Sequence, residues 1–140
     1  LHPRRSGASY RRCRYMTEDS TRATRIRGIR GATRVDNDDS DSVRAATREL
    51  LSEMLERNNL TADSVISAFF TVTHDLVSEF PARAAREIGW KDVAMLCSLE
   101  IPVRGSLDHV IRVLLHAEIV SGMSVKHVYL NGTEGLRPDL

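Results

Sequence analysis

Short apolar segments rich in β-branched and aromatic residues alternate along this chain with segments whose apolar residues recur at helical spacing. Two of the strand-like segments are VISAFFTV at Val65–Val72 and VAMLCSL at Val93–Leu99. The first helical pattern is carried by Val43, Ala46, Leu50, Leu51, Met54 and Leu55. Alternating strands and helices usually form one sheet with helices packed on it. The chain is therefore expected to be a single α/β (α+β) domain, with a mixed β-sheet and helices on one face.

The remaining segments extend this alternation. A first strand is expected from Thr24 to Val35, where Gly28 and Gly31 allow a backbone or a ligand to come close. Pro81 suits the first turn of a second helix, which is expected to stop at Gly89.

The segment Gly105–Ala117 is expected to be a third helix, because its apolar residues fall on one helical face. These residues are Leu107, Val110, Ile111, Leu114 and Leu115. VKHVYL at Val125–Leu130 is expected to be the last strand, so the predicted order is β, α, β, α, β, α, β.

Composition excludes several classes of protein. With 140 residues, 41% of them hydrophobic and 28% charged, the chain fits one globular domain with a core. A net charge of +1 and the absence of an apolar run of about 18 residues argue against nucleic-acid and membrane partners. Cys13 and Cys97 form no CxxC motif, so a reduced, cytoplasmic protein is expected.

The N-terminal segment Leu1–Tyr15 differs from the rest of the chain. It contains no acidic residue, and its arginines are Arg4, Arg5, Arg11, Arg12 and Arg14. We expect residues 1–23 to be a disordered or non-native basic extension, and residues 24–140 to form the domain.

Common catalytic motifs are missing from the sequence. The histidines form no HExxH or HxH pattern, and there is no GxSxG or Walker motif. The run Arg27-Gly28-Ile29-Arg30-Gly31 is not GxGxxG, which argues against dinucleotide binding. No metal and no cofactor are predicted.

Arginines at structured positions are the remaining candidates for a site. Arg30 lies in the glycine-flanked strand, Arg83 and Arg86 are three residues apart, and Arg112 lies among apolar residues. A guanidinium that is buried needs an anion or several acceptors. Residue patterns alone therefore predict a possible carboxylate site and do not identify its ligand.

Several segments, in this order, resemble the monofunctional bacterial chorismate mutases of the trimeric α/β class. The segments are Ile26-Arg27-Gly28-Ile29-Arg30-Gly31-Ala32-Thr33, Phe80-Pro81-Ala82-Arg83-Ala84-Ala85-Arg86, Cys97-Ser98-Leu99-Glu100, Ile111-Arg112-Val113, His127-Val128-Tyr129-Leu130 and Leu136-Arg137-Pro138-Asp139-Leu140. The resemblance covers about Arg25 to Leu140 and implies a homotrimeric pseudo α/β-barrel with active sites between subunits.

The resemblance also implies roles for five catalytic residues. Arg30 would hold one substrate carboxylate, and Arg112 would hold the other carboxylate and the ether oxygen. Glu100 and the Cys97 region would bind the ring hydroxyl, and Tyr129 would contact the side-chain carboxylate.

Substrate-binding residues follow from the same resemblance. The adjacent subunit would contribute Phe80, Ala82, Arg83 and Arg86. Leu136 and Arg137 would lie in a tail that caps the site. Arg83 stands where the family commonly has lysine, which keeps the charge and alters its geometry.

The implied reaction is the Claisen rearrangement of chorismate to prephenate in the shikimate pathway of aromatic amino-acid biosynthesis. It is an intramolecular isomerisation without a covalent intermediate or cofactor. The alternative reading is a non-catalytic or deaminase-like small-metabolite-binding α/β trimer. Nucleic-acid binding through the basic N-terminus has less support, because stacking aromatics are sparse there.

Overall fold

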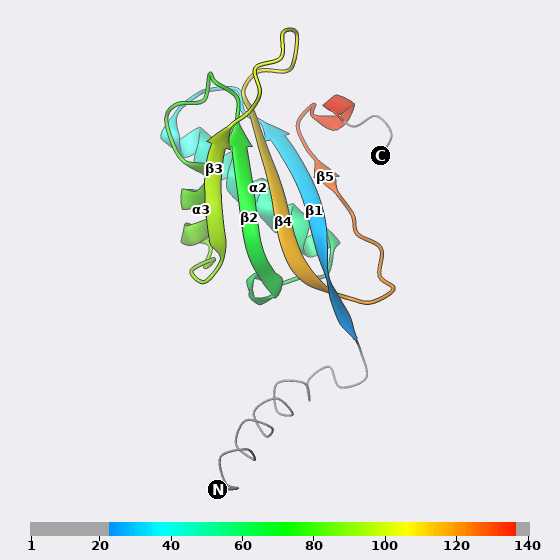
Figure 1. Cartoon of the computed structure of the whole chain (residues 1–140). Coiled ribbons are helices and arrows are strands. Elements are labelled where there is room, and N and C mark those ends of the chain that lie inside the picture. The colour runs from blue at the N-terminus through cyan, green and yellow to red at the C-terminus, as the bar shows by residue number, and fades with distance from the viewer. Residues whose placement is uncertain (1–22, 137–140) are drawn as a thin grey trace, which may run out of the picture.

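A five-stranded mixed sheet with two α-helices on one face makes up the computed structural model, which describes residues 23–136 (Figure 1). Its elements are β1 Thr24–Arg34, α2 Ser40–Arg57, the 3₁₀ turn Ala62–Ser64, β2 Val65–Val72, α3 Pro81–Glu87, β3 Ala94–Leu99, β4 Val110–Val120, β5 Val128–Tyr129 and the 3₁₀ turn Glu134–Leu136. The strand order is β3-β2-β4-β1-β5. β4 pairs antiparallel with β1 and β2, whereas β3 and β5 pair in parallel with β2 and β1. The predicted fold class is confirmed.

Helix α2 covers the centre of the sheet. Asp39 caps its N-terminus by accepting a hydrogen bond from the Ser42 N–H at 2.8 Å. Its fully buried Leu50 and Met54 pack over β1, where Gly31 leaves the space that they occupy. The core between the helices and the sheet also contains Trp90 and Phe70, which are 1% and 0% exposed.

The prediction of a helix at Gly105–Ala117 is wrong, because this region contains the central strand β4. Buried residues alternate along β4, at Ile111, Val113, Leu115, Ala117 and Ile119. Leu114 lies on the opposite face of the sheet. Because it is adjacent to Leu115 in the sequence, the two leucines together resemble the apolar face of a helix. Pairing with β1 and β2 on both sides decides the structure in favour of the strand.

The last predicted strand is shorter than expected. Only Val128–Tyr129 pairs with β1, and residues 121–127 form the connection from β4. Leu136 ends the final 3₁₀ turn, whereas Arg137 and residues 1–22 lie outside the described part of the chain. No helix among the described residues is long and apolar enough to cross a membrane.

The face of the sheet opposite the helices exposes apolar side chains. Ile26, Phe69, Leu96 and Leu114 lie on this open face and are 61%, 43%, 66% and 39% exposed. Successive strand residues point to opposite faces, so these side chains alternate with the core residues. The open face therefore presents a large apolar surface around the polar groups described next.

Candidate active site

One pocket on the open face is lined by Arg30, Glu100, Arg112 and Tyr129, together with apolar residues that include Phe69. Its volume is about 240 Å³. These four residues come from β1, the position after β3, β4 and β5, so the pocket exists only after the sheet has assembled.

Sheet register explains why these side chains meet. Arg112 on β4 lies between Ala32 of β1 and Thr71 of β2. Tyr129 on β5 lies beside Ala32 on the other side. Arg30 precedes Ala32 by two residues, and residues two apart in a strand point to the same face. The two arginines and the tyrosine therefore surround one patch of the sheet.

Glu100 is held by the backbone and by two side chains. Its N–H donates to the Val72 carbonyl at 2.8 Å, which extends the pairing of β3 with β2 by one residue. Its Oε2 accepts a hydrogen bond from Thr71 Oγ1 at 2.7 Å and lies 3.6 Å from Arg112 Nη1. The Ile101 N–H donates to Oε1 at 3.3 Å. The carboxylate is thus fixed at the rim of the pocket.

The charges in this pocket favour an anionic ligand. The side chains of Arg112 and Glu100 are 36% and 26% exposed, so both are partly desolvated and still accessible. One carboxylate faces two guanidinium groups, since Arg30 lines the same pocket. A guanidinium has five N–H donors, so the long contact with Glu100 leaves donors for a second anion.

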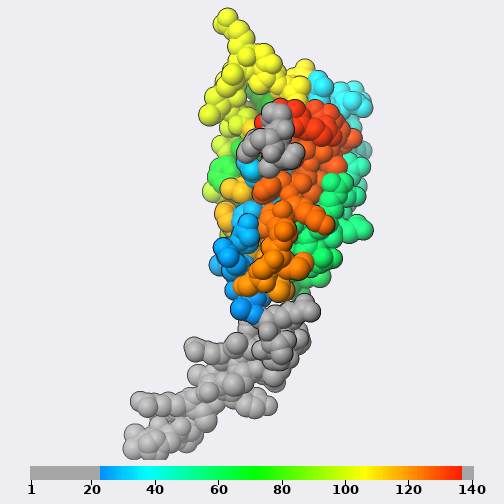
Figure 2. All heavy atoms as spheres, turned by 90° about the vertical axis from the view of Figure 1, so that its right-hand side faces the viewer, coloured from blue at the N-terminus to red at the C-terminus, as the bar shows by residue number. Residues whose placement is uncertain are grey.

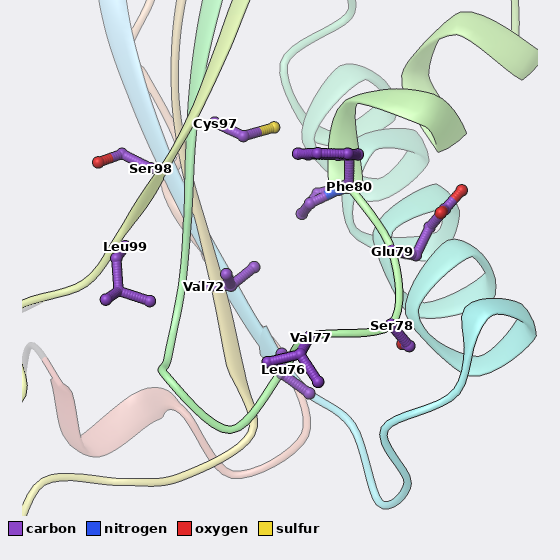
Figure 3. Close-up of a pocket in the computed structure, with 10 residues that line it drawn as sticks. Val72, Leu76, Val77, Ser78, Glu79, Phe80, Cys97, Ser98 and Leu99 are labelled. Carbon is purple, nitrogen blue, oxygen red and sulfur yellow. The ribbon is translucent and has the colours of Figure 1, made fainter.

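A second pocket lies between the end of the sheet and the start of α3 (Figure 3). Its volume is about 250 Å³, and Phe80 and Cys97 face each other across it. Cys97 pairs in register with the buried Phe70, so its side chain points to the helix-covered face. Strand alternation therefore separates Cys97 from Arg112.

Helix α3 supplies the other predicted substrate-binding residues. Pro81 occupies its first turn, Ala82 is 5% exposed, and Arg83 and Arg86 are exposed. Arg83 Nη1 contacts Glu79 Oε1 at 2.9 Å. The arginines of α3 are thus available at the surface beside the second pocket.

The Cys97 thiol is free and half-buried. Burial raises its pKa above the ordinary value, although a backbone hydrogen bond from Ala82 and the charge of Arg86 act in the opposite direction. A thiol with a raised pKa is protonated at neutral pH and is a poor nucleophile.

Residues 26–140 match the family model described as chorismate mutase type I. The chain belongs to this family.

Relatives of this chorismate mutase family member agree with that assignment. The chorismate mutase AroH of Thermus thermophilus is 49% identical over 117 residues, which are 82% of this chain and 96% of the relative. The protein of the same name from Bacillus subtilis (strain 168) is 39% identical over 117 residues, which are 82% of this chain and 92% of the relative. A solved chorismate mutase structure from Clostridium thermocellum has a TM-score of 0.73 and 46% identity, and the match covers 78% of this chain and 98% of that one.

In a single chain of this family member, the predicted site residues lie in two separate groups. Arg30, Glu100, Arg112 and Tyr129 share the pocket on the open face. The second group lies at α3 and the adjoining end of β3, and comprises Phe80, Ala82, Arg83, Arg86 and Cys97. Leu136 lies in the last 3₁₀ turn and lines neither of these two pockets.

The pocket of this chorismate mutase family member also contains Thr71 and Phe69, which were not expected from the sequence. Both belong to VISAFFTV, which was interpreted only as a buried strand. The missed signal was the alternation within it, because Phe70 points into the core while its two neighbours point to the open face.

Among residues 23–136, no group of three or more His, Cys, Asp or Glu side chains is placed to hold a metal ion.

Proposed function

We propose that the domain formed by residues 24–140 converts chorismate to prephenate at a site built around Arg30 and Arg112. The observation that carries the proposal is the convergence of both guanidinium groups, Glu100 and Tyr129 on one pocket. Chorismate is a dicarboxylate with a ring hydroxyl, so this set of donors and acceptors complements it. The proposal includes a role in aromatic amino-acid biosynthesis in the cytoplasm, as the family resemblance implies.

Arg112 is assigned the main catalytic role. In the rearrangement a C–O bond breaks while a C–C bond forms within the same molecule, and negative charge builds on the ether oxygen. A fixed guanidinium donates to that oxygen and to a carboxylate at once, because its donors form a planar fork. Position in a paired strand keeps Arg112 in place before the reaction, which is the condition for electrostatic stabilisation of a transition state.

Holding the substrate in a compact shape supplies the second part of the rate enhancement. Arg30 and Tyr129 are assigned to the carboxylates, and Glu100 to the ring hydroxyl. Gripping both ends of a flexible molecule removes conformational entropy before the bond changes begin. None of these roles requires a nucleophile, and the raised pKa of Cys97 agrees with a packing role for that side chain.

A homotrimer with sites shared between subunits is part of the proposal. Three features of the single chain support it. The apolar open face has no cover among the described residues, and the two groups of site residues lie on opposite faces of the sheet. At about 240 Å³, the pocket is also smaller than the usual ligand site of about 300–1,000 Å³. A neighbouring copy that brings α3 to this pocket would enlarge and close it.

The decisive experiment is an ultraviolet assay of chorismate loss with the purified chain, together with detection of prephenate. Turnover well above the uncatalysed rate is expected. Binding of chorismate without turnover would instead favour a metabolite-binding protein.

Arg112→Ala tests the assignment of the catalytic arginine. Removing one preorganised donor of this kind costs about 100- to 1,000-fold in kcat. Arg57→Ala is the matched control, because Arg57 is an exposed arginine on α2 that pairs with Glu53. If the folded Arg112→Ala protein retains activity within about tenfold of the parent, this role is contradicted.

A further inference from the structure

We propose that His127 is a positioning residue, whose ring nitrogen Nδ1 holds the backbone of Arg30 in register with Tyr129. The inference rests on the proposed function, since Arg30 and Tyr129 are assigned there to the substrate carboxylates. His127 belongs to the segment His127-Val128-Tyr129-Leu130, and its side chain has no part in the proposed chemistry.

The central observation is a hydrogen bond from the Arg30 N–H to His127 Nδ1 at 2.9 Å. Backbone pairing between β1 and β5 is confined to Gly31 with Val128 and Ala32 with Tyr129. The imidazole therefore takes the place of a carbonyl and extends this parallel ladder by one residue, to the strand position from which Arg30 projects.

Hydrogen bonds anchor the chain on both sides of His127. On one side, Lys126 exchanges two hydrogen bonds with the Asn58 side chain at the end of α2, at 2.8 and 2.9 Å. On the other side, the Leu130 N–H donates to the Ala32 carbonyl at 2.9 Å. Figure 2 shows the residues before β5, in orange, lying between β1 in blue and the end of α2 in green. The segment is thus tied at both ends, and His127 provides its side-chain link to Arg30.

This link restricts the position of both groups that would hold carboxylates. β5 is only two residues long, so its pairing alone is a weak constraint on Tyr129. A hydrogen bond from the side chain two residues earlier adds a second point of attachment. Displacing a substrate-holding group by about 1 Å costs up to about 100-fold in rate, which makes this constraint relevant to turnover.

The hydrogen bond requires one protonation state of the ring. Nδ1 accepts a hydrogen bond only when the imidazole is neutral and Nε2 carries the hydrogen. Burial lowers the pKa of His127, and the charge of Arg27 on β1 lowers it further. Its chain neighbour Lys126 is also cationic, whereas the nearby end of α2 contributes the uncharged Asn58. The neutral form is therefore favoured at neutral pH, and the hydrogen bond is lost as the pH falls through the lowered pKa.

Three substitutions separate positioning from bulk packing. His127→Asn places an amide oxygen near the position of Nδ1 and keeps the acceptor. His127→Gln places its amide near Nε2, and His127→Leu removes the acceptor. We expect kcat/KM to fall by about 10- to 100-fold in the Gln and Leu variants, and by less than about threefold in the Asn variant. If the Leu variant fails to fold, the comparison of Asn with Gln still decides.

The pH profile gives a readout that packing alone would not move. Below about pH 6.5, the ordinary pKa of histidine, the parent protein should lose kcat/KM as the falling pH protonates His127. His127→Asn should lack this loss and retain only the titrations that it shares with the parent. Identical profiles for the two proteins would overturn the inference.

Nuclear magnetic resonance tests the geometry without reference to activity. The ¹⁵N shift of His127 at neutral pH should show Nδ1 without a proton, and the Arg30 amide signal should move when the ring titrates. A proton on Nδ1, or equal impairment of the Asn and Gln variants, would overturn the inference. Absence of chorismate turnover in the parent protein, with the expected ¹⁵N shifts present, would instead reject the proposed function and leave the hydrogen bond intact.

Discussion

At the scale of single residues, the Thr71 hydroxyl determines how closely Glu100 is paired with Arg112. Its Oε2 is 2.7 Å from Thr71 Oγ1 and 3.6 Å from Arg112 Nη1. The carboxylate is therefore bound more closely by the neutral hydroxyl than by the guanidinium. Because Thr71 holds the carboxylate, Arg112 retains donors for the substrate.

Thr71→Val should release Glu100 toward Arg112 and raise KM for chorismate. A hydrogen bond to a charged group contributes roughly 1.5–3 kcal/mol, so kcat/KM should fall by about tenfold or more. Thr71→Ser keeps the hydroxyl and should remain close to the parent in steady-state kinetics. Ser67→Ala, which removes another hydroxyl from the same face of β2, is the matched control. Equal kinetics for the Val and Ser variants would contradict this role.

Cys97 offers a residue-scale prediction that depends on pH. Its pKa is raised chiefly by burial, so the thiolate forms only above the usual range for a thiol. In a Cys13→Ser background, alkylation by iodoacetamide should be slow at neutral pH and accelerate as the pH rises through this raised pKa. Rapid alkylation at neutral pH would show an activated thiol and would reopen the question of a covalent mechanism.

At the scale of elements, the packing of α2 on β1 depends on the absence of a side chain at Gly31. A Cβ at this position would overlap Met54 Sδ and lie 3.2 Å from Leu50 Cδ1. Both of these residues are fully buried, so neither can move without repacking the core.

Gly31→Ala should therefore destabilise the protein by about 1–3 kcal/mol, the usual cost of overpacking a core. Gly28→Ala is the matched control on the same strand, because its Cβ would meet Leu114 at 3.5 Å, an ordinary contact. The control should change the free energy of unfolding by less than about 0.5 kcal/mol. Urea denaturation measures both effects, and equal midpoints would show that the close approach of α2 tolerates a methyl group.

At the scale of the whole molecule, the uncovered apolar face and the divided site have one common explanation. A second copy that covers the open face removes apolar surface from water, and it also brings α3 to the pocket around Arg112. Assembly and activity would then depend on the same contact.

Ile26→Asp should weaken the assembly, because a charge would be buried at an apolar contact. Ile26 lies on the open face, is 61% exposed, and lines neither of the two pockets. Sedimentation should show three times the chain mass for the parent protein and a lower mass for the variant. Met123→Asp, on the connection between β4 and β5, is the control and should keep the parent mass. A parent protein that sediments as a single chain would exclude the trimer.

Mixing two inactive variants tests whether subunits share a site. Arg86→Ala removes a residue of the α3 group, and Arg112→Ala removes a residue of the open-face pocket. After subunit exchange, some interfaces should combine two intact groups and recover part of the parent kcat. Exchange verified by mass spectrometry without any recovery would argue for sites complete within one chain.

The sequence by itself determined the elements whose patterns depend on near neighbours. Helix α3 begins at Pro81, β2 spans the predicted Val65–Val72, and the candidate arginines were identified from their positions in structured segments. Resemblance to a family added the expected roles of those residues.

Only the tertiary structure decided that Val110–Val120 is a strand, that Thr71 belongs to the pocket, and that Cys97 points away from Arg112. The physical reason is the same in each case. A local pattern of apolar residues is compatible with either a helix or a strand, and it does not specify which face a strand presents to which neighbour. The pairing of β4 with β1 and β2, and of β3 with β2, settled both questions. The register of a sheet is set by residues far apart in the sequence.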